Sequence, residues 1–120
     1  MRGLFRMAKP RFEVSLRLSF EGHVAVLDDR AVRLLELIDA HGSITHAATA
    51  LGISYRTAWL LVDRLQACGE GPVVSASRGG TINGTRLTST GQALVGQFRR
   101  IERELAGFLD QLNGDLQASG

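Results

Sequence analysis

The chain has 120 residues, a formal net charge of +2 and a hydrophobic fraction of 44%. That length allows one hydrophobic core and no second ordinary domain, so we expect a single domain over residues 1–120 without a separate effector domain. The single cysteine, Cys68, excludes an internal disulfide and a cysteine-based metal cluster. The sequence has no apolar run long enough for a membrane span and no apolar leader, which predicts a cytoplasmic protein without a membrane partner.

The chain begins with a basic stretch that is followed by an alternating one. Residues 1–10 show no periodicity and are predicted to form a basic arm. In residues 11–27 apolar residues recur at every second position with a break at residues 21–23, which predicts two strands joined by a short turn. Because an isolated hairpin is marginal in water, this β-hairpin is expected to pack on the rest of the domain or against another strand.

A helix is predicted to follow, from Asp28 to Gly42. Asp28 and Asp29 suit the positive amino-terminal end of a helix, and Gly42 suits the left-handed conformation that often ends one. This helix is expected to support the motif that comes next. Its apolar face is formed by Ala31, Leu34, Leu35 and Ile38.

Residues 42–65, GSITHAATALGISYRTAWLLVDRL, have the pattern of two short helices joined by a tight turn. Ser43 and Ser54 are suitable amino-terminal caps, and Gly52 is a suitable stop for the first helix. The pattern predicts a helix-turn-helix unit whose helices bury one face each. These faces are Ile44, Ala47, Ala48 and Leu51 in the first helix, and Ala58, Leu61, Val62 and Leu65 in the second.

The second helix of this unit leaves a mixed polar and aromatic surface facing outward. At about 100° per residue, Arg56 and Leu60 lie opposite the apolar face, with Tyr55 and Trp59 on one flank. An arginine one turn after a hydroxyl cap suits the major groove of duplex DNA. For Trp59 we favour packing against a neighbouring helix over contact with bases, because aromatic side chains on the flank of a short helix usually pack.

A glycine-rich segment follows the second helix. Residues 73–77 are predicted to be a strand, and residues 78–86 a loop in which Arg78 and Arg86 bracket several glycines and an Asn-Gly pair. In isolation this composition would favour a flexible surface hairpin. Its position directly after the second helix favours a wing that lies along the DNA backbone or in the minor groove.

These motifs resemble a known family. Residues 42–65, and especially the run GISYRTAW, resemble the N-terminal winged helix-turn-helix of ModE-type molybdate-responsive transcriptional regulators, and more distantly that of LysR-type regulators. The run VVSASRGGTINGTRLTSTGQAL resembles the wing of that family and its entry into a long helix. The resemblance covers about residues 28–112 and implies a DNA-binding regulator linked to molybdate or a related oxyanion. Sensing members of the family also have a C-terminal oxyanion-binding region, which we do not expect within these 120 residues.

Residues 88–112 are predicted to form the longest helix, with a polar, unstructured tail at residues 113–120. Its apolar residues recur with alternating spacings of four and three, the heptad pattern of a helix that pairs with another helix. Because little else in the chain could cover this face, the partner is expected to be a second copy, in a homodimer. The predicted dimerisation residues are Leu94, Phe98, Ile101, Leu105, Phe108 and Leu112.

The sequence therefore predicts a mostly α fold with small β: a winged helix-turn-helix with an N-terminal β-hairpin and a long C-terminal dimerisation helix. The predicted function is a homodimeric transcriptional regulator that reads a pseudo-palindromic operator in double-stranded DNA. The alternatives are a winged-helix protein-interaction module and a stand-alone oxyanion sensor, and the identity of any effector is left open. The histidines are scattered and no nucleophile has a recognisable base, so we expect no enzyme activity, no metal site and no cofactor. The predicted DNA-binding residues are Ser43, Thr45, Ser54, Tyr55, Arg56, Thr57, Leu60, Arg64, Arg78 and Arg86.

Overall fold

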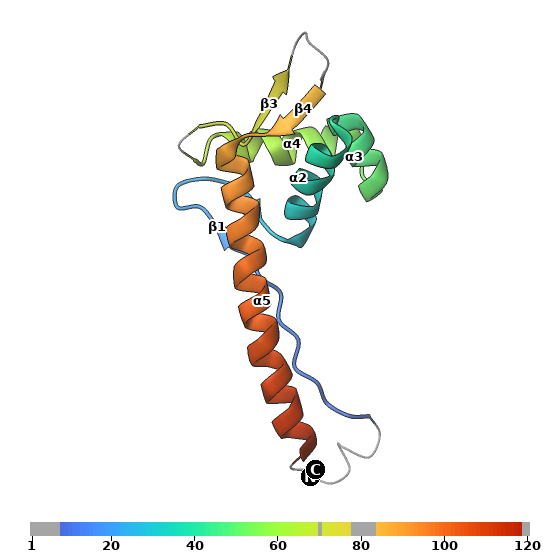
Figure 1. Cartoon of the computed structure of the whole chain (residues 1–120), viewed down its shortest axis with the longest axis vertical. Coiled ribbons are helices and arrows are strands. Elements are labelled where there is room, and N and C mark those ends of the chain that lie inside the picture. The colour runs from blue at the N-terminus through green and yellow to red at the C-terminus, as the bar shows by residue number, and fades with distance from the viewer. Residues whose placement is uncertain (1–7, 70, 78–83, 119–120) are drawn as a thin grey trace.

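The computed structural model describes residues 8–69, 71–77 and 84–118. It is mostly helical, with two small antiparallel hairpins and a long C-terminal helix, which confirms the predicted mostly α fold with small β (Figure 1). In chain order the elements are β1 (Leu18–Ser19), β2 (Val26–Leu27), α2 (Asp29–His41), α3 (Ile44–Leu51), α4 (Tyr55–Gln66), β3 (Val74–Ser77), β4 (Gly84–Leu87) and α5 (Ser89–Ala118).

Helix α2 lies at the centre of the core. All four residues predicted for its apolar face are buried, and Val32 is buried with them. Helices α3 and α4 contribute the small residues Ala47, Ala48 and Ala58 to the same core, so the predicted apolar faces of both helices are confirmed. The rest of the core is formed by Ala25, Leu27, Val62, Leu65, Val73, Val74, Leu87 and Phe98.

Short-range capping sets the boundaries of these helices, as predicted for Ser43 and Ser54; at Asp28 the cap adds to the favourable helix dipole that we predicted. The side chains of Asp28, Ser43 and Ser54 each accept a hydrogen bond from the backbone N–H three residues later, at 2.9, 3.2 and 3.1 Å. Gly42 ends α2 with φ 71°, and Gly52 ends α3 with φ 77°. Both glycines are in the left-handed region, where a side chain would be strained, so the turns of residues 42–43 and 52–54 are fixed by the sequence itself.

The second hairpin is more regular than predicted. Strand β3 agrees with the predicted strand, but Gly84, Thr85 and Arg86, which we predicted to be in a loop, belong to strand β4. Ser75 is paired with Arg86 and Ala76 with Thr85. The prediction was wrong here because glycine, threonine and asparagine signal a turn locally, while docking of this segment on α2 extends the strand. Arg78 lies outside the described residues.

The N-terminal hairpin is much shorter than the predicted 11–27. Only two residue pairs form, Leu18 with Leu27 and Ser19 with Val26. Residues 8–17 instead run without regular structure alongside α5, and Phe12 and Val14 are 53% and 56% exposed (Figure 1). The alternation of apolar residues was therefore not a strand signal over its whole length. A long-range contact replaced strand pairing, because Asn113 of α5 holds the backbone of Phe12 through two hydrogen bonds.

Helix α5 is longer than predicted and has two distinct parts. It continues to Ala118, so the prediction of an unstructured tail from residue 113 was wrong. Its first part packs on the core, where Phe98 is only 2% exposed and Leu94 is partly buried. Its second part extends away from the core together with residues 8–17 (Figure 1). In the described part of the chain, no helix combines the length and hydrophobicity that a membrane span requires.

Candidate DNA-binding surface

Helix α4 has one buried face and one face open to solvent. Ala58, Val62 and Leu65 are buried, whereas Arg56 is exposed and Tyr55 is 54% exposed. Among the other residues predicted to bind DNA, Thr45, Ser54 and Arg64 are exposed, and Ser43, Thr57 and Leu60 are partly buried. The structure therefore brings most of the predicted residues to the surface of α4 and to the beginnings of α3 and α4.

The amino-terminal end of α4 is organised by two hydroxyl groups. The Ser54 hydroxyl accepts a hydrogen bond from the Thr57 N–H at 3.1 Å and donates one to the Thr57 hydroxyl at 2.9 Å. This arrangement holds the first turn in place while Tyr55 and Arg56, directly after the cap, stay exposed. The end of a helix with a positive partial charge and an arginine beside it favours an anionic partner.

We expected Trp59 to pack against a neighbouring helix, but its side chain is exposed. Its side chain is 46% exposed, and it is not among the residues that pack against the core. Tyr55 lies one turn earlier on the same helix and is also exposed, so α4 presents two neighbouring aromatic side chains to solvent. Exposed aromatic residues of this size are typical of interaction surfaces.

The hairpin β3–β4 is attached to both α4 and α2. The side-chain amide of Gln66, the last residue of α4, accepts hydrogen bonds from the N–H groups of Val73 and Val74 and donates one to the Val74 carbonyl. On the other strand, the Thr85 N–H donates to the Gly42 carbonyl at 2.8 Å. The base of the hairpin is therefore hydrogen-bonded to the ends of two core helices, α4 and α2.

The guanidinium group of Arg86, a predicted DNA contact, is bonded within the protein. Its Nη1 donates to the main-chain carbonyl of Asp39 at 2.6 Å, and the carboxylate of Asp39 accepts from the Leu87 N–H at 3.1 Å. A Cβ on Gly84 would lie 2.3 Å from the Gly42 carbonyl oxygen, so only glycine fits this approach of β4 to the end of α2.

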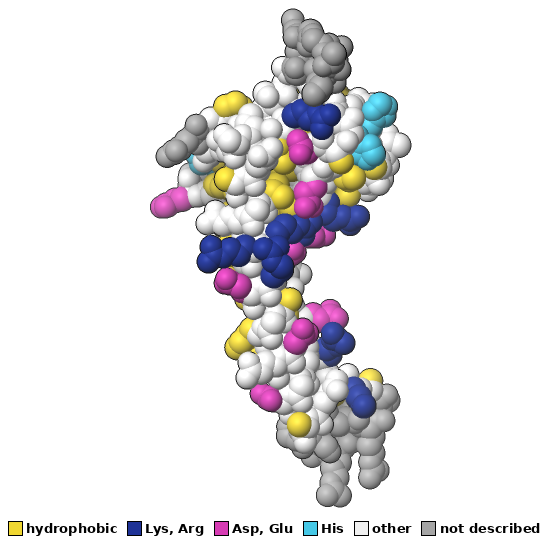
Figure 2. Space-filling view, in the orientation of Figure 1, with side chains coloured by type: hydrophobic (Ala, Val, Ile, Leu, Met, Phe, Trp, Pro, Cys, Tyr) yellow, Lys and Arg dark blue, Asp and Glu magenta, His cyan; other side chains and the backbone are white. Residues whose placement is uncertain are grey.

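An ion-pair network joins α5 to α2. Arg99 of α5 donates to Asp29 at 3.0 Å and Glu36 at 2.6 Å, both on α2, and to Glu102 on its own helix at 2.7 Å. The hydrogen bond to Glu36 is the main cause of a raised pKa of the Arg99 guanidinium, with smaller contributions from Glu102 and Asp29. Figure 2 shows dark-blue and magenta side chains interleaved where α5 leaves the core, and the ion pairs of Arg99 neutralise part of this charge within the protein.

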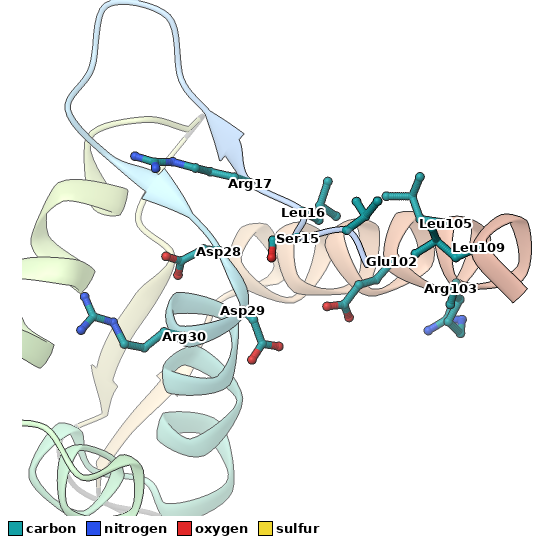
Figure 3. Close-up of a pocket in the computed structure, with 12 residues that line it drawn as sticks. Ser15, Leu16, Arg17, Asp28, Asp29, Arg30, Glu102, Arg103, Leu105 and Leu109 are labelled. Carbon is teal, nitrogen blue, oxygen red and sulfur yellow. The ribbon is translucent and has the colours of Figure 1, made fainter. Parts of the chain in front are cut away.

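An open groove of about 720 Å³ lies between residues 14–17, the start of α2 and α5 (Figure 3). Its apolar wall includes Leu105 and Leu109. The arginines at its rim do not converge on the groove, because Arg17 and Arg30 extend to the left in Figure 3, away from α5, whereas Arg103 projects from α5 itself. Of the acids at its rim, Asp28 caps α2, and Asp29 and Glu102 bind Arg99. The described side chains of the groove therefore offer no concentrated charge for an oxyanion.

Sequence reasoning missed three residues that organise this region: Asp39, Gln66 and Asn113. Asp39 had a visible signal, since an acid in the last turn of a helix opposes the helix dipole. Asn113 had no such signal, because its burial and its hydrogen bonds to Phe12 become visible only in the structure. Gln66 carried no comparable signal, since glutamine is common at helix ends.

Several curated proteins match the chain, although no family model does. The chain is 42% identical over 105 residues to the molybdenum-pterin-binding protein MopA of Rhodobacter capsulatus, covering 87% of this chain and 39% of that protein. It is 35% identical over 121 aligned positions to the molybdenum transport protein ModE of Azotobacter vinelandii, covering 93% of this chain and 44% of that protein. The chain is related to ModE-type proteins.

A further ModE-type relative is the transcriptional regulator ModE of Haemophilus influenzae, which is 32% identical over 78 residues, 64% of this chain and 31% of that protein. The chain spans less than half the length of each of these relatives. Since 93% of the chain aligns with the Azotobacter protein, the ModE-type similarity extends well beyond the α3–α4 unit. The resemblance that the sequence motifs indicated is thus supported at the level of the family.

Proposed function

We propose that the chain is a sequence-specific, double-stranded DNA-binding module of a ModE-type transcriptional regulator, with α3 and α4 as a helix-turn-helix and β3–β4 as its wing. The observation that carries the proposal is the surface of α4. Its first turn is capped by Ser54 and exposes Tyr55 and Arg56, while its opposite face is buried in the core. A rigidly held helix with a free, basic amino-terminal half is what entry into a major groove requires.

Within this proposal the residues have different roles. Arg56 is placed to read a base edge, most simply the two acceptors of guanine. Backbone N–H groups and hydroxyl groups at the starts of α3 and α4 contact phosphates and fix the register. Arg78, which follows β3 in the sequence, is expected to contact a phosphate or the minor groove. The remaining proposed contacts are Ser43, Thr45, Ser54, Tyr55, Thr57, Leu60, Arg64 and Arg86.

We propose that the module acts as a homodimer through the outer part of α5. Ile101 is 38% exposed and Phe108 is 59% exposed, and both lie on the predicted heptad face. Leu94 and Phe98 are removed from this interface, because they pack in the core of their own chain. The proposed contacts between copies are therefore Ile101, Leu105, Phe108 and Leu112.

A link to molybdenum is part of the proposal and rests on the names of the relatives. One is described as a molybdenum-pterin-binding protein and others as a molybdenum transport protein and a transcriptional regulator. We propose that this chain supplies the DNA-binding part of such regulation and has no catalytic role. A second candidate, a protein-interaction module, is favoured by the exposure of Tyr55 and Trp59 on one flank of α4.

Selection of bound duplexes from a random pool tests the proposal. We expect a consensus with two related half-sites about 34–36 Å apart, or a multiple of that distance. Arg56→Ala should weaken binding to the selected site by about 1–3 kcal/mol and relax preference at one base position. Arg103→Ala, which removes the same charge from α5, is the control and should leave base preference unchanged.

Trp59 provides a direct readout, because it is the single tryptophan of the chain and lies on α4. Its fluorescence should change when the selected duplex is added and should saturate with the binding curve. A pool that yields no consensus, together with unchanged Trp59 emission at saturating duplex, would contradict sequence-specific binding and favour the interaction module.

A further inference from the structure

Asp39 opposes the usual charge preference of its helix. It lies in the last turn of α2, where the helix dipole disfavours a carboxylate. Such a violation of a local rule points to a compensating contact elsewhere in the fold. The compensating contact of Asp39 is on β4, 48 residues later in the chain.

Asp39 and Gly42 accept hydrogen bonds along the outer edge of β4, where a further strand would otherwise pair. The Asp39 carboxylate accepts the Leu87 N–H at 3.1 Å, and the Gly42 carbonyl accepts the Thr85 N–H at 2.8 Å. These two N–H groups alternate along β4, so both point away from β3 and toward the end of α2. The Asp39 main-chain carbonyl also accepts from Arg86, whose charge partly offsets that of the carboxylate.

The inner strand of the same hairpin is held independently. Gln66 at the end of α4 bonds the backbone of Val73 and Val74 through both ends of its side-chain amide. Thr88, at the start of α5, donates its N–H to the Val73 carbonyl at 3.0 Å. With β3 tied to α4 and β4 tied to α2, the direction in which the hairpin leaves the core depends on both attachments.

We propose that Asp39 is a positioning residue for DNA binding, which acts through β4 and does not touch DNA. This inference rests on the proposed function. The same attachment includes the Nη1 group of Arg86, whose side chain is exposed and remains a predicted DNA contact. When the Leu87 N–H has no acceptor, β4 tilts away from α2, and the hairpin no longer reaches its phosphates although no positive charge has been removed.

Removal of the negative charge of Asp39 provides the test, because an electrostatic role and a positioning role predict opposite changes in affinity for DNA. Asp39→Ala removes a negative charge, so a purely electrostatic account predicts tighter binding to DNA. Positioning predicts binding about 3- to 10-fold weaker, the effect of removing one hydrogen bond of ordinary strength. The salt slope should also fall by about 0.9 for each phosphate that the hairpin no longer neutralises.

Asp39→Asn is the matched variant. It removes the same charge but keeps an oxygen that can accept the Leu87 N–H. We expect Asp39→Asn to bind the selected duplex at least as tightly as the wild type, with the wild-type salt slope. Amide hydrogen exchange without DNA should show faster exchange at Leu87 in Asp39→Ala alone, while the core amides of Leu35 and Ile38 stay protected in all three proteins.

The outcomes separate the two hypotheses. If the wild type binds no duplex, the proposed function is overturned and the role of Asp39 with it. If the wild type binds and Asp39→Ala binds equally or more tightly, the positioning role alone is overturned. It is also overturned if Asp39→Asn weakens binding as much as Asp39→Ala does, or if Leu87 exchange does not change.

Discussion

The two ends of the molecule differ in how completely they bury the apolar faces of their helices. The head, which comprises residues 24–69, 71–77 and 84–98, buries the apolar faces of α2, α3 and α4 within one chain. The stalk, which comprises residues 8–17 and 99–118, leaves Phe12, Val14 and Phe108 more than half exposed. In the stalk Asn113 is the buried residue, and its burial depends on two hydrogen bonds to Phe12.

This difference separates what one chain can stabilise from what requires a partner. In the head each helix contributes an apolar face to a shared core, and burial of this kind is the main source of stability. In the stalk an unstructured segment lies on one side of α5, where Leu105 lines the groove beside it, and leaves Ile101 and Phe108 of the heptad face exposed. We infer that the head folds in the single chain, whereas the stalk is completed by a second copy.

The largest effect should come from the centre of the head. Leu35 is fully buried, so Leu35→Ala leaves a cavity and should lower the free energy of unfolding by about 3–5 kcal/mol. Urea denaturation monitored by circular dichroism measures this change. A decrease of less than about 1 kcal/mol would mean that the head is not the stable unit that the comparison requires.

A smaller effect should follow from changing the exposed face of the stalk. Phe108→Glu places a charge where we propose that two copies meet, and it should weaken self-association by about 2–3 kcal/mol. Because Phe108 is 59% exposed in one chain, unfolding of the isolated chain at low concentration should not change measurably. A dilution series in analytical ultracentrifugation measures self-association, and thermal denaturation at low concentration measures the stability of the single chain. Equal losses of self-association and of single-chain stability would contradict the distinction between head and stalk.

Arg99 connects the two regions and should matter less than either. Arg99→Ala should cost about 1–2 kcal/mol, because the three ion pairs are partly solvated and individually weak. The raised pKa of Arg99 stabilises the folded state at every pH below the pKa of an unfolded arginine, and this stabilisation is lost only above it. The difference between wild type and variant should therefore stay constant from about pH 7 to pH 10, which chemical denaturation across that range would check.

The attachment of residues 8–17 should be the weakest of these attachments. Asn113→Ala removes two hydrogen bonds near the end of α5, and because water can replace both at the half-exposed Phe12, the cost should stay at about 0.5–1.5 kcal/mol. The measurable result is faster hydrogen exchange at the Phe12 amide, with the amides of the head unchanged. Unchanged exchange at Phe12 would show that other interactions hold this segment.

The reactivity of Cys68 should show whether this residue lies within the packed head. Burial raises the pKa of the Cys68 thiol, so less of the reactive thiolate is present near neutral pH than for a free cysteine. Alkylation by iodoacetamide near neutral pH should therefore be slower than that of a model thiol, and it should become faster on unfolding in urea. Equal rates in the folded and unfolded protein would place Cys68 outside the packed head.

The head could be predicted from sequence because local signals determine it. Asp28, Ser43 and Ser54 cap their helices and Gly42 and Gly52 end them within a few residues, so the boundaries of α2, α3 and α4 follow from neighbouring residues. The outcome for Trp59 could not be predicted this way. Its exposure depends on what lies beside α4 in three dimensions, which the spacing of residues on one helix does not reveal.

The stalk and the second hairpin were predicted less well because distant contacts shape them. Asn113 bonds Phe12 across 101 residues of sequence, and this contact accompanies both the longer α5 and the shorter N-terminal strands. Asp39 and Leu87 are 48 residues apart, and their contact extends β4 into a segment that looks like a loop locally. Neither pairing has a periodic signal that sequence analysis could detect.

Sedimentation equilibrium of the wild-type chain tests most directly the claim that the stalk is completed by a second copy. We predict a mass twice that of the single chain, which is 13.0 kDa, at micromolar concentration. The double variant Ile101→Glu with Leu105→Glu serves as the control and should sediment at the single-chain mass with its helical content retained. A wild type that remains at 13.0 kDa across the accessible concentrations would contradict the account.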